Sequence, residues 1–401
     1  MKFGIIREGK IPPDRRVVFP PDLLEKFRNQ YPQAEIKVQS SPIRFFPDEE
    51  YSALGFEVAD DISDCDVLIG VKEVPIPDLI PNKTYLFFSH TTKMQPYNQA
   101  LLQACIDENI RLIDHESLVS DDGMRLVAFG RYAGIVGAYN GIRAFGIKNK
   151  TFQLPKAEEL HSQNELLETL QNIDLPAIKI VLTGVGRVAR GAREMLDGID
   201  IPQVSMEEFL EKEFHHPVYV QLEVGEYYKR KDGNPAARLN FFKNPTHYES
   251  DFEKFSNRAD LFIAGHFYKE GSPYILTQEM LQNPECKIQV VADISCDIAG
   301  PVASTIRPST IAEPIYGYLP QNGSEVPIET PGAITVMAVD NLPCELPKDA
   351  SEGFGKMFLK HVIPAFFNED KDEILKRGTI CDSGKLTASF DYLEGYVQSK
   401  I

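Results

Sequence analysis

The chain has 401 residues, of which 43% are hydrophobic and 25% charged, a composition typical of globular proteins rather than of disordered, coiled-coil or fibrous chains. The formal net charge of -17 argues against nucleic acid as a main partner, because an acidic surface repels phosphate backbones. At about 150 residues per domain, the length predicts two or three domains.

Features of membrane, secreted and zinc proteins are missing from the sequence. No apolar run approaches the roughly 18 residues that a membrane helix needs. The segment 1–7 becomes charged at once, unlike a secretory signal peptide. The six cysteines form no CxxC pair and no cluster of zinc-ligand spacing. We therefore expect a cytoplasmic protein with reduced thiols, no metal and no membrane partner.

Short apolar runs alternate with helical stretches in the first part of the chain. The runs that predict strands are Lys2–Ile6, Ile36–Gln39, Asp66–Val71, Thr84–Phe88, Ile110–Ile113 and Leu126–Phe129. Residues 101, 102, 105 and 106 form one apolar face of a helix. This alternation predicts parallel strands joined by crossover helices, an α/β fold. The small residues from Ala133 to Ala138 predict a helix that packs closely against another element.

A second alternating block follows. Its predicted strands are Ile178–Leu182, Asp260–Ala264, Ile288–Ala292 and Ile334–Met337. Segment 213–248 is polar, with a predicted turn at 229–234, and Pro308–Thr330 is rich in Pro, Gly and polar residues, which predicts a long loop. The tail from Ser351 has a helical pattern that Pro364 interrupts.

A glycine-rich turn between the first strand of the second block and a helix predicts a dinucleotide site. Residues 178–191 read IKIVLTGVGRVARG. Gly184 would allow the tight turn, and Gly186 would let the backbone approach a pyrophosphate at the helix N-terminus. Position 189 is Ala, which the fingerprint accepts. The predicted cofactor contacts are Gly184, Gly186, Arg187 and Val188.

The choice of coenzyme stays open at this point. The fingerprint expects an acidic residue about 20 positions further on, to bind the ribose. Glu207 and Glu208 are near that distance, but they look like the start of a helix. Arg187 and Arg190 could meet a phosphate, so both NAD and NADP are compatible with the sequence.

Polar residues follow three strands of the first block. Lys72 and Glu73 close one strand, His90 closes the next, and Glu116 follows the third. Open α/β sheets bind ligands at the carboxyl ends of their strands. A lysine and a histidine at adjacent strand ends could act as an acid–base pair.

An arginine after the first strand suits an acidic substrate. Arg16 lies near the predicted pair, and a guanidinium binds a carboxylate in bidentate fashion. Arg15 is the competing candidate.

Several segments resemble the group of alanine dehydrogenase, transhydrogenase and saccharopine dehydrogenase. The resemblance is greatest for lysine-forming saccharopine dehydrogenase and lysine–2-oxoglutarate reductase. The matching segments read REGK at 7–10, VKEVP at 71–75, YLFFSHTTKMQPYN at 85–98, LIDHESL at 112–118, LVAFGRYAGIVGAY at 126–139, VVADISCD at 290–297 and AVDNLPCELP at 338–347. The third and last of these are specific to the saccharopine branch. Segment 213–248 does not resemble the family.

The resemblance implies roles for residues at matching positions. Lys72 and His90 match the catalytic acid–base pair, and Arg16 matches the arginine that binds a substrate carboxylate. Glu73 and Glu116 match carboxylates on the amine side of the substrate. The matches to the nicotinamide side of the site are Asp297, Asp340 and Asn341.

The resemblance also implies two Rossmann-like lobes with mostly parallel sheets and a cleft between them. Residues 1–138 with 341–401 would form the substrate domain, and residues 139–340 the dinucleotide-binding domain. The expected activity is interconversion of saccharopine with L-lysine and 2-oxoglutarate, with NAD as cofactor and NADP as the alternative. Two other functions stay open: an alanine dehydrogenase-like or other opine-forming enzyme, and a non-catalytic dinucleotide-binding regulator.

Overall fold

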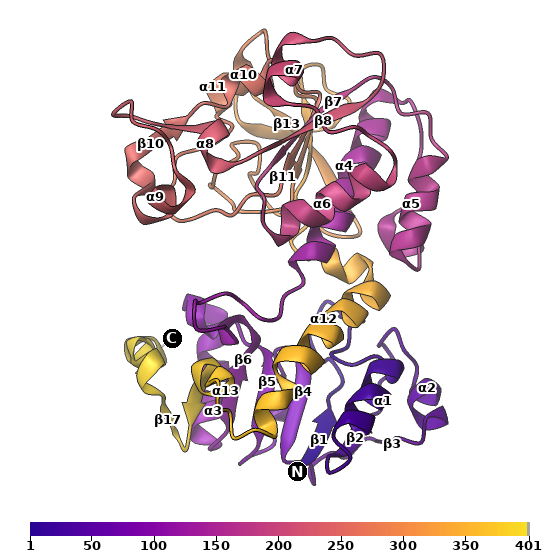
Figure 1. Cartoon of the computed structure of the whole chain (residues 1–401), viewed down its shortest axis with the longest axis vertical. Helices are drawn as coiled ribbons and strands as arrows, with labels where there is room; N and C mark the ends of the chain where they lie inside the picture. Colours follow the sequence, from indigo (N-terminus) through magenta and orange to yellow (C-terminus); the bar gives the residue numbers. More distant parts are fainter. Residues whose placement is uncertain (399–401) are drawn as a thin grey trace. The chain divides into compact units, whose positions relative to one another are not determined.

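The computed structural model describes residues 1–398, which form two compact units, each around its own sheet (Figure 1). The first unit joins residues 1–129 to residues 347–398, and the second comprises residues 130–346. Both sheets are mostly parallel, so the predicted α/β class is confirmed. No helix within residues 1–398 is long and apolar enough to cross a membrane.

The sheet of the first unit has the strand order β17-β16-β6-β5-β4-β1-β2-β3. Six strands run parallel: β1 (Lys2–Ile5), β2 (Glu35–Gln39), β3 (Glu57–Ala59), β4 (Val67–Lys72), β5 (Thr84–Phe88) and β6 (Arg111–Asp114). The C-terminal part of the chain adds β16 (Thr379–Asp382) and β17 (Lys385–Leu386), which pair antiparallel next to β6. The carboxyl ends of β4, β5 and β6 therefore lie side by side at one edge of the sheet.

Helices cover this sheet with apolar faces that the sequence encodes. They are α1 (Pro21–Gln30), α2 (Asp48–Ala53), α3 (Gln99–Asp107), α12 (Pro347–His361), α13 (Ile374–Gly378) and α14 (Glu394–Gln398). The predicted face of α3 buries Leu101, Leu102 and Cys105 in one cluster with Leu112. The predicted tail helix is α12, whose Phe354 is fully buried.

The sheet of the second unit has the order β14-β13-β15-β12-β11-β7-β8. Its parallel strands are β7 (Lys179–Thr183), β8 (Val218–Leu222), β11 (Leu261–Ala264), β12 (Val290–Asp293) and β15 (Ile334–Met337). Antiparallel β13 (Ile315–Leu319) and β14 (Ser324–Val326) extend it at one edge. The chain runs from β7 outward to β8 and then returns to β11 on the other side of β7. The switch point of this doubly wound sheet therefore lies between β7 and β11.

The helix α4 (Gly130–Asn149) packs tightly against α6 (Arg187–Gly198), as its small residues predict. A Cβ atom on Gly134 would lie 1.9 Å from the carbonyl oxygen of Val188, so only glycine permits this approach. The predicted domain boundary at 138/139 falls within α4. The helix contacts β11, β12 and β15 as well as α6, so the second unit begins at Gly130 and continues to Leu346.

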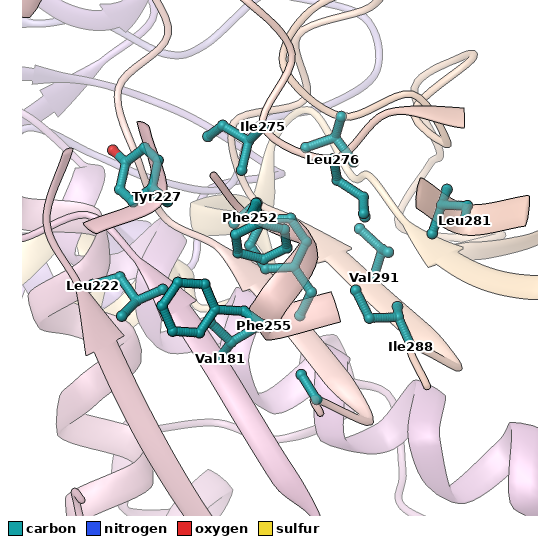
Figure 2. Packing of buried hydrophobic residues seen from close by; sticks show 14 of the residues in the cluster. Val181, Leu222, Tyr227, Phe252, Phe255, Ile275, Leu276, Leu281, Ile288 and Val291 are labelled. Atoms are coloured by element: carbon teal, nitrogen blue, oxygen red, sulfur yellow. The ribbon is translucent and has the colours of Figure 1, made fainter. Parts of the chain in front are cut away.

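An aromatic and aliphatic core packs on the second sheet (Figure 2). Phe252 and Phe255 are fully buried and lie near Val181 of β7, with Ile275 and Val291 in the same cluster. The helices that contribute to this unit besides α4 and α6 are α5 (Gln163–Gln171), α7 (Met206–Glu211), α8 (Val224–Tyr227), α9 (Arg238–Lys243), α10 (Glu253–Ser256) and α11 (Gln278–Gln282). The short strands β9 (Tyr228–Arg230) and β10 (Tyr248–Ser250) form a separate antiparallel pair, with the predicted turn directly after β9.

Two sequence predictions of local structure are wrong. Leu126–Phe129 is not a strand; Phe129 is buried because its ring stacks on Phe354 at a centroid distance of 4.5 Å. Pro308–Thr330 is not one long loop, since it contains β13 and β14. Antiparallel pairing with β15 supplies the backbone hydrogen bonds of β13 despite the flanking prolines.

Candidate active site

The first unit brings Lys72, His90 and Glu116 to the carboxyl ends of three neighbouring strands. Lys72 is the last residue of β4 and pairs in register with Phe88 of β5, two positions before His90. Glu116 follows β6 in a short 3-10 turn. His90 has a positive φ of 54°, a backbone conformation that is uncommon for a residue other than glycine. Such conformations cluster at functional sites, which is consistent with a site at this edge of the sheet.

Glu73 connects His90 to Lys10. Its Oε1 accepts a hydrogen bond of 2.6 Å from Lys10 Nζ, and its Oε2 lies 3.4 Å from His90 Nδ1. Burial by itself would raise the pKa of Glu73, but His90 and Lys10 together lower it to about 2. The side chain is therefore a carboxylate at neutral pH. A carboxylate that faces Nδ1 favours the tautomer with its proton on Nδ1, which leaves Nε2 to act as the base.

Glu8 fixes the backbone at the end of β4. Its two carboxylate oxygens accept hydrogen bonds from the backbone N–H groups of Val71, at 2.7 Å, and Lys72, at 2.8 Å. Burial and the nearby Asp14 raise the pKa of Glu8 to about 8. Sequence reasoning selected neither Glu8 nor Lys10 as a site residue. Both residues lie in the segment REGK at 7–10, and its resemblance to the family is the sequence signal that points to them.

Arg16 is buried, whereas the competing Arg15 is exposed. The Nε and Nη2 atoms of Arg16 donate to the carboxylate of Asp14 at 3.0 and 2.5 Å, and the Arg16 guanidinium lies 4.2 Å from the centroid of Phe129. A guanidinium held on a carboxylate and an aromatic ring has a fixed orientation, as bidentate recognition requires. Burial therefore favours Arg16 over Arg15 as the residue of a pocket.

Glu116 is half-buried between two surface cations. Its Oε1 lies 3.5 Å from Lys93 Nζ and 3.6 Å from Arg125 Nη1. Its backbone N–H donates to Asp114, which also accepts hydrogen bonds from the backbone and the hydroxyl group of Ser89. Asp114 thus ties the ends of β5 and β6 together.

His115, next to Glu116, has the surroundings of a core residue. Its Nε2 lies 2.8 Å from the carbonyl oxygen of Gly70, and its ring packs edge-on against Phe88, Phe354 and Phe358. Burial lowers the pKa of His115 to about 4, so the ring is neutral at pH 7. We assign this histidine to the core.

The second unit places the glycine-rich turn at the switch point of its sheet. Gly184 has a φ of +94°, and a Cβ there would lie 2.7 Å from the carbonyl oxygen of Gly265, after β11. Gly186 is the N-cap of α6, and a Cβ added to it would meet no atom within 4 Å. The exposed backbone at this helix N-terminus fits a pyrophosphate group. Arg187 and Val188 follow in the first turn of α6 and are half-buried.

Glu223 occupies the position that the ribose-binding acid takes in dinucleotide folds. Glu207 and Glu208, the sequence candidates, lie in the first turn of α7, where Glu208 forms a capping box with Ser205. Glu223 follows β8, the strand next to β7, and lines an open cavity of about 710 Å³ that Val185 of the glycine turn also lines. The spacing rule missed Glu223 because α7 precedes β8 and lengthens the connection.

The predicted nicotinamide-side residues follow β12 and β15, at the same edge of the second sheet. Asp297 lies in the loop after β12 and is half-buried. Asp340, which is exposed, and Asn341, the N-cap of a 3-10 turn, follow β15. Near them, burial raises the pKa of Cys296 to about 12, helped by Asp293, so its thiol stays protonated at neutral pH.

His266 lies beneath the glycine turn. Its Nδ1 atom is 2.8 Å from Thr183 Oγ1, and burial lowers the pKa of His266 to about 3. In the part of the chain that the structure describes, no group of three His, Cys, Asp or Glu side chains could hold a metal ion.

Comparisons with known proteins identify the class to which this architecture corresponds. The family described as "Alanine dehydrogenase/PNT, N-terminal domain" matches residues 4–136. The chain superposes on a solved L-alanine dehydrogenase with a TM-score of 0.67 and 14% identity, covering 99% of this chain and 100% of that one. A transhydrogenase from Sinorhizobium meliloti gives a TM-score of 0.59 at 15% identity, with 96% and 99% covered. The chain therefore has the fold of alanine dehydrogenase.

The curated relatives come from the saccharopine branch. An alpha-aminoadipic semialdehyde synthase of Arabidopsis thaliana is 26% identical over 97% of this chain and 41% of its own length. A saccharopine dehydrogenase [NAD(+), L-lysine-forming] of Yarrowia lipolytica is 24% identical over 82% of this chain and 83% of its own length. The chain spans less than half of the first of these relatives. The predicted resemblance to saccharopine dehydrogenase within the alanine dehydrogenase/transhydrogenase group is thus confirmed.

Proposed function

We propose that this protein is an NAD-dependent amino-acid dehydrogenase that interconverts saccharopine with L-lysine and 2-oxoglutarate. The observation that carries the proposal is the group of Lys72, Glu73 and His90 at adjacent strand ends, in a chain some of whose relatives are named saccharopine dehydrogenase. We propose that the first unit binds the substrates and that the second binds the dinucleotide.

Lys72 and His90 share the proton transfers in this proposal. The ε-amine of lysine adds to the keto carbon of 2-oxoglutarate, and the resulting carbinolamine loses water to give an imine. In the first step the keto oxygen gains a proton and the amine nitrogen loses one. In the second the same oxygen gains another proton and leaves as water while the nitrogen loses its proton, and a positioned acid–base pair can move these protons. Glu73 faces Nδ1 of the His90 ring, and Lys10 holds Glu73 in turn. Glu8 fixes the backbone from which the Lys72 side chain projects.

The remaining charged residues bind substrate groups. We assign Arg16 to a carboxylate of 2-oxoglutarate, because its guanidinium has a fixed orientation and guanidinium groups bind carboxylates. Glu73 and Glu116 supply negative charge on the amine side, which suits the cationic end of lysine.

The second unit would hold the dinucleotide through Gly184, Gly186, Arg187 and Val188 at the pyrophosphate. The open space at Gly186 supports that fit. When bound, the nicotinamide exchanges a hydride with the carbon of the imine. We assign Asp297, Asp340 and Asn341 to its surroundings.

Glu223 supports NAD over NADP as the coenzyme. A carboxylate at this position can accept a hydrogen bond from the 2′-hydroxyl of the ribose. The same carboxylate would repel the 2′-phosphate of NADP.

A substrate panel tests the proposed function. NADH oxidation is followed with lysine plus 2-oxoglutarate, ornithine plus 2-oxoglutarate, and pyruvate plus ammonia. We expect turnover with the first pair. Turnover with ornithine alone would identify a different opine-forming enzyme, and turnover with pyruvate and ammonia alone would identify an alanine dehydrogenase. NADH binding without turnover across the panel would favour a non-catalytic regulator.

A further inference from the structure

Residues 224–250, most of which belong to the segment 213–248 that does not resemble the family, form a wall beside the dinucleotide turn. It contains α8, β9, α9 and β10, which are grouped at one side of the second unit (Figure 1). Its inner face is aromatic: the rings of Tyr228 and Phe241 stack at 4.7 Å, and Phe241 meets Tyr248 edge-on at 5.2 Å. All three are buried, so the wall is packed against the rest of the unit.

This wall lines the same cavity as the glycine turn and Glu223. Val185 of the turn and Gln221 of β8 contribute one side, and Ala236, Ala237 and Arg238 contribute another. Gln221 Nε2 also donates a hydrogen bond of 2.9 Å to the carbonyl oxygen of Gly184. The cavity therefore extends from Val185 of the glycine turn, past Glu223, to the wall.

Arg238 presents a flat cation to this cavity. It is exposed at the first turn of α9, and its side chain forms no ion pair or hydrogen bond with another residue within the described chain 1–398. Its guanidinium lies over the ring of Phe242, 5.9 Å from the centroid. Phe242 in turn packs edge-on against Phe267, which follows β11 and is 72% exposed. One face of the guanidinium is thus backed by an aromatic ring at the cavity.

We propose that Arg238 stacks on the adenine ring of the bound dinucleotide and that the wall of residues 224–250 is its adenine-binding surface. The inference rests on the proposed dinucleotide site. With the pyrophosphate at Gly186 and the ribose at Glu223, the adenine extends into the cavity that Arg238 lines. Guanidinium planes stack on bases, and such stacking does not require a contact to the phosphates.

Calorimetric titration of the whole protein with NADH, NADPH and AMP tests the inference without any turnover. Arg238→Ala should weaken the binding of all three by a similar factor, roughly 5- to 50-fold. Arg238→Lys should bind as poorly as Arg238→Ala, because lysine keeps the charge but lacks the plane. Lys229→Ala is the matched control: Lys229 is an exposed cation of the same wall that pairs with Glu249 at 3.4 Å, and its loss should change nothing. Thermal melting checks that each variant is folded.

The outcomes separate the possible sources of failure. Unchanged binding of NADH and AMP to Arg238→Ala overturns the inference alone. A loss confined to NADPH, restored in Arg238→Lys, also overturns it and identifies Arg238 as a partner of the 2′-phosphate. A wild-type protein that binds neither coenzyme overturns the proposed function and the inference with it.

Discussion

The carboxylate of Glu73 lies 3.4 Å from Nδ1 of His90, while its other oxygen is held by Lys10 at 2.6 Å. A carboxylate that faces Nδ1 favours the imidazole tautomer with its proton on that atom. The contacts of Glu73 join residues from three separate stretches of the chain at the carboxyl ends of β4 and β5. The proposed proton transfers depend on them.

Replacing either member of the proposed acid–base pair should abolish most of the turnover. Lys72→Met and His90→Gln should each lower kcat by about 10²–10⁴-fold, because a positioned acid or base contributes that much. Binding of NADH, measured by calorimetry, should stay nearly intact. Lys26→Met, an exposed lysine of α1, is the control. Full activity in both variants would rule out this assignment.

Arg16→Ala should separate the two substrates. Loss of the guanidinium removes the bidentate contact to a carboxylate, so the KM for 2-oxoglutarate should rise far more than the KM for lysine. Steady-state kinetics with each substrate varied in turn measures both constants. Arg15→Ala, at the neighbouring exposed arginine, should leave both unchanged. Equal increases for the two substrates in Arg16→Ala would contradict the proposed role.

Glu73 should make the stability of the protein sensitive to acid. Its pKa is about 2 in the folded chain against an ordinary 4.5, so its contribution is present above about pH 4.5 and is lost as the pH falls towards 2. The expected loss is about 3 kcal/mol of unfolding free energy. Urea denaturation between pH 5 and 2.5 should show a flatter pH dependence for Glu73→Gln than for the wild type. Glu49→Gln, at an exposed carboxylate of α2, should keep the wild-type slope.

Two glycines of the dinucleotide turn should respond differently to alanine. Gly186→Ala should fold normally, since its Cβ meets no protein atom, but NADH binding should weaken by more than about tenfold as the methyl group occupies the pyrophosphate position. Gly184→Ala should lower Tm, because of its φ of +94° and the contact of 2.7 Å with Gly265. Thermal melting and calorimetry on both variants measure the difference. Unaltered NADH affinity in Gly186→Ala would place the pyrophosphate elsewhere.

The sequence predicts those parts of the structure that depend on local patterns. Buried parallel strands such as β5 and β15 have the bounds that their apolar runs indicate. The strand β13 is obscured because Pro314 before it and Gly317 within it indicate a loop, and only pairing with the distant β15 makes it a strand. Leu126–Phe129 shows the opposite case, where tertiary packing buries an apolar run that pairs with no strand.

The residues of the candidate site also divide into those that local sequence patterns reveal and those that depend on contacts between distant segments. Strand-end positions such as Lys72 and His90 can be found from the sequence because the rule that places ligands at strand ends is local to each strand. Contacts between distant segments cannot be found this way. Lys10 reaches Glu73, and Glu8 reaches the backbone of Lys72, only because β1 pairs with β4 in the sheet. Glu223 lies beyond the expected spacing because its connection contains an extra helix.

Mass spectrometry of the product formed from ε-¹⁵N-lysine, 2-oxoglutarate and NADH tests the proposed function most directly. Reductive joining of the two substrates retains the ε-nitrogen, so the product should be saccharopine that carries the label. Lys72→Met should form far less of it under the same conditions. Oxidation of NADH that yields no labelled saccharopine, or the same yield from the wild type and Lys72→Met, would contradict the account.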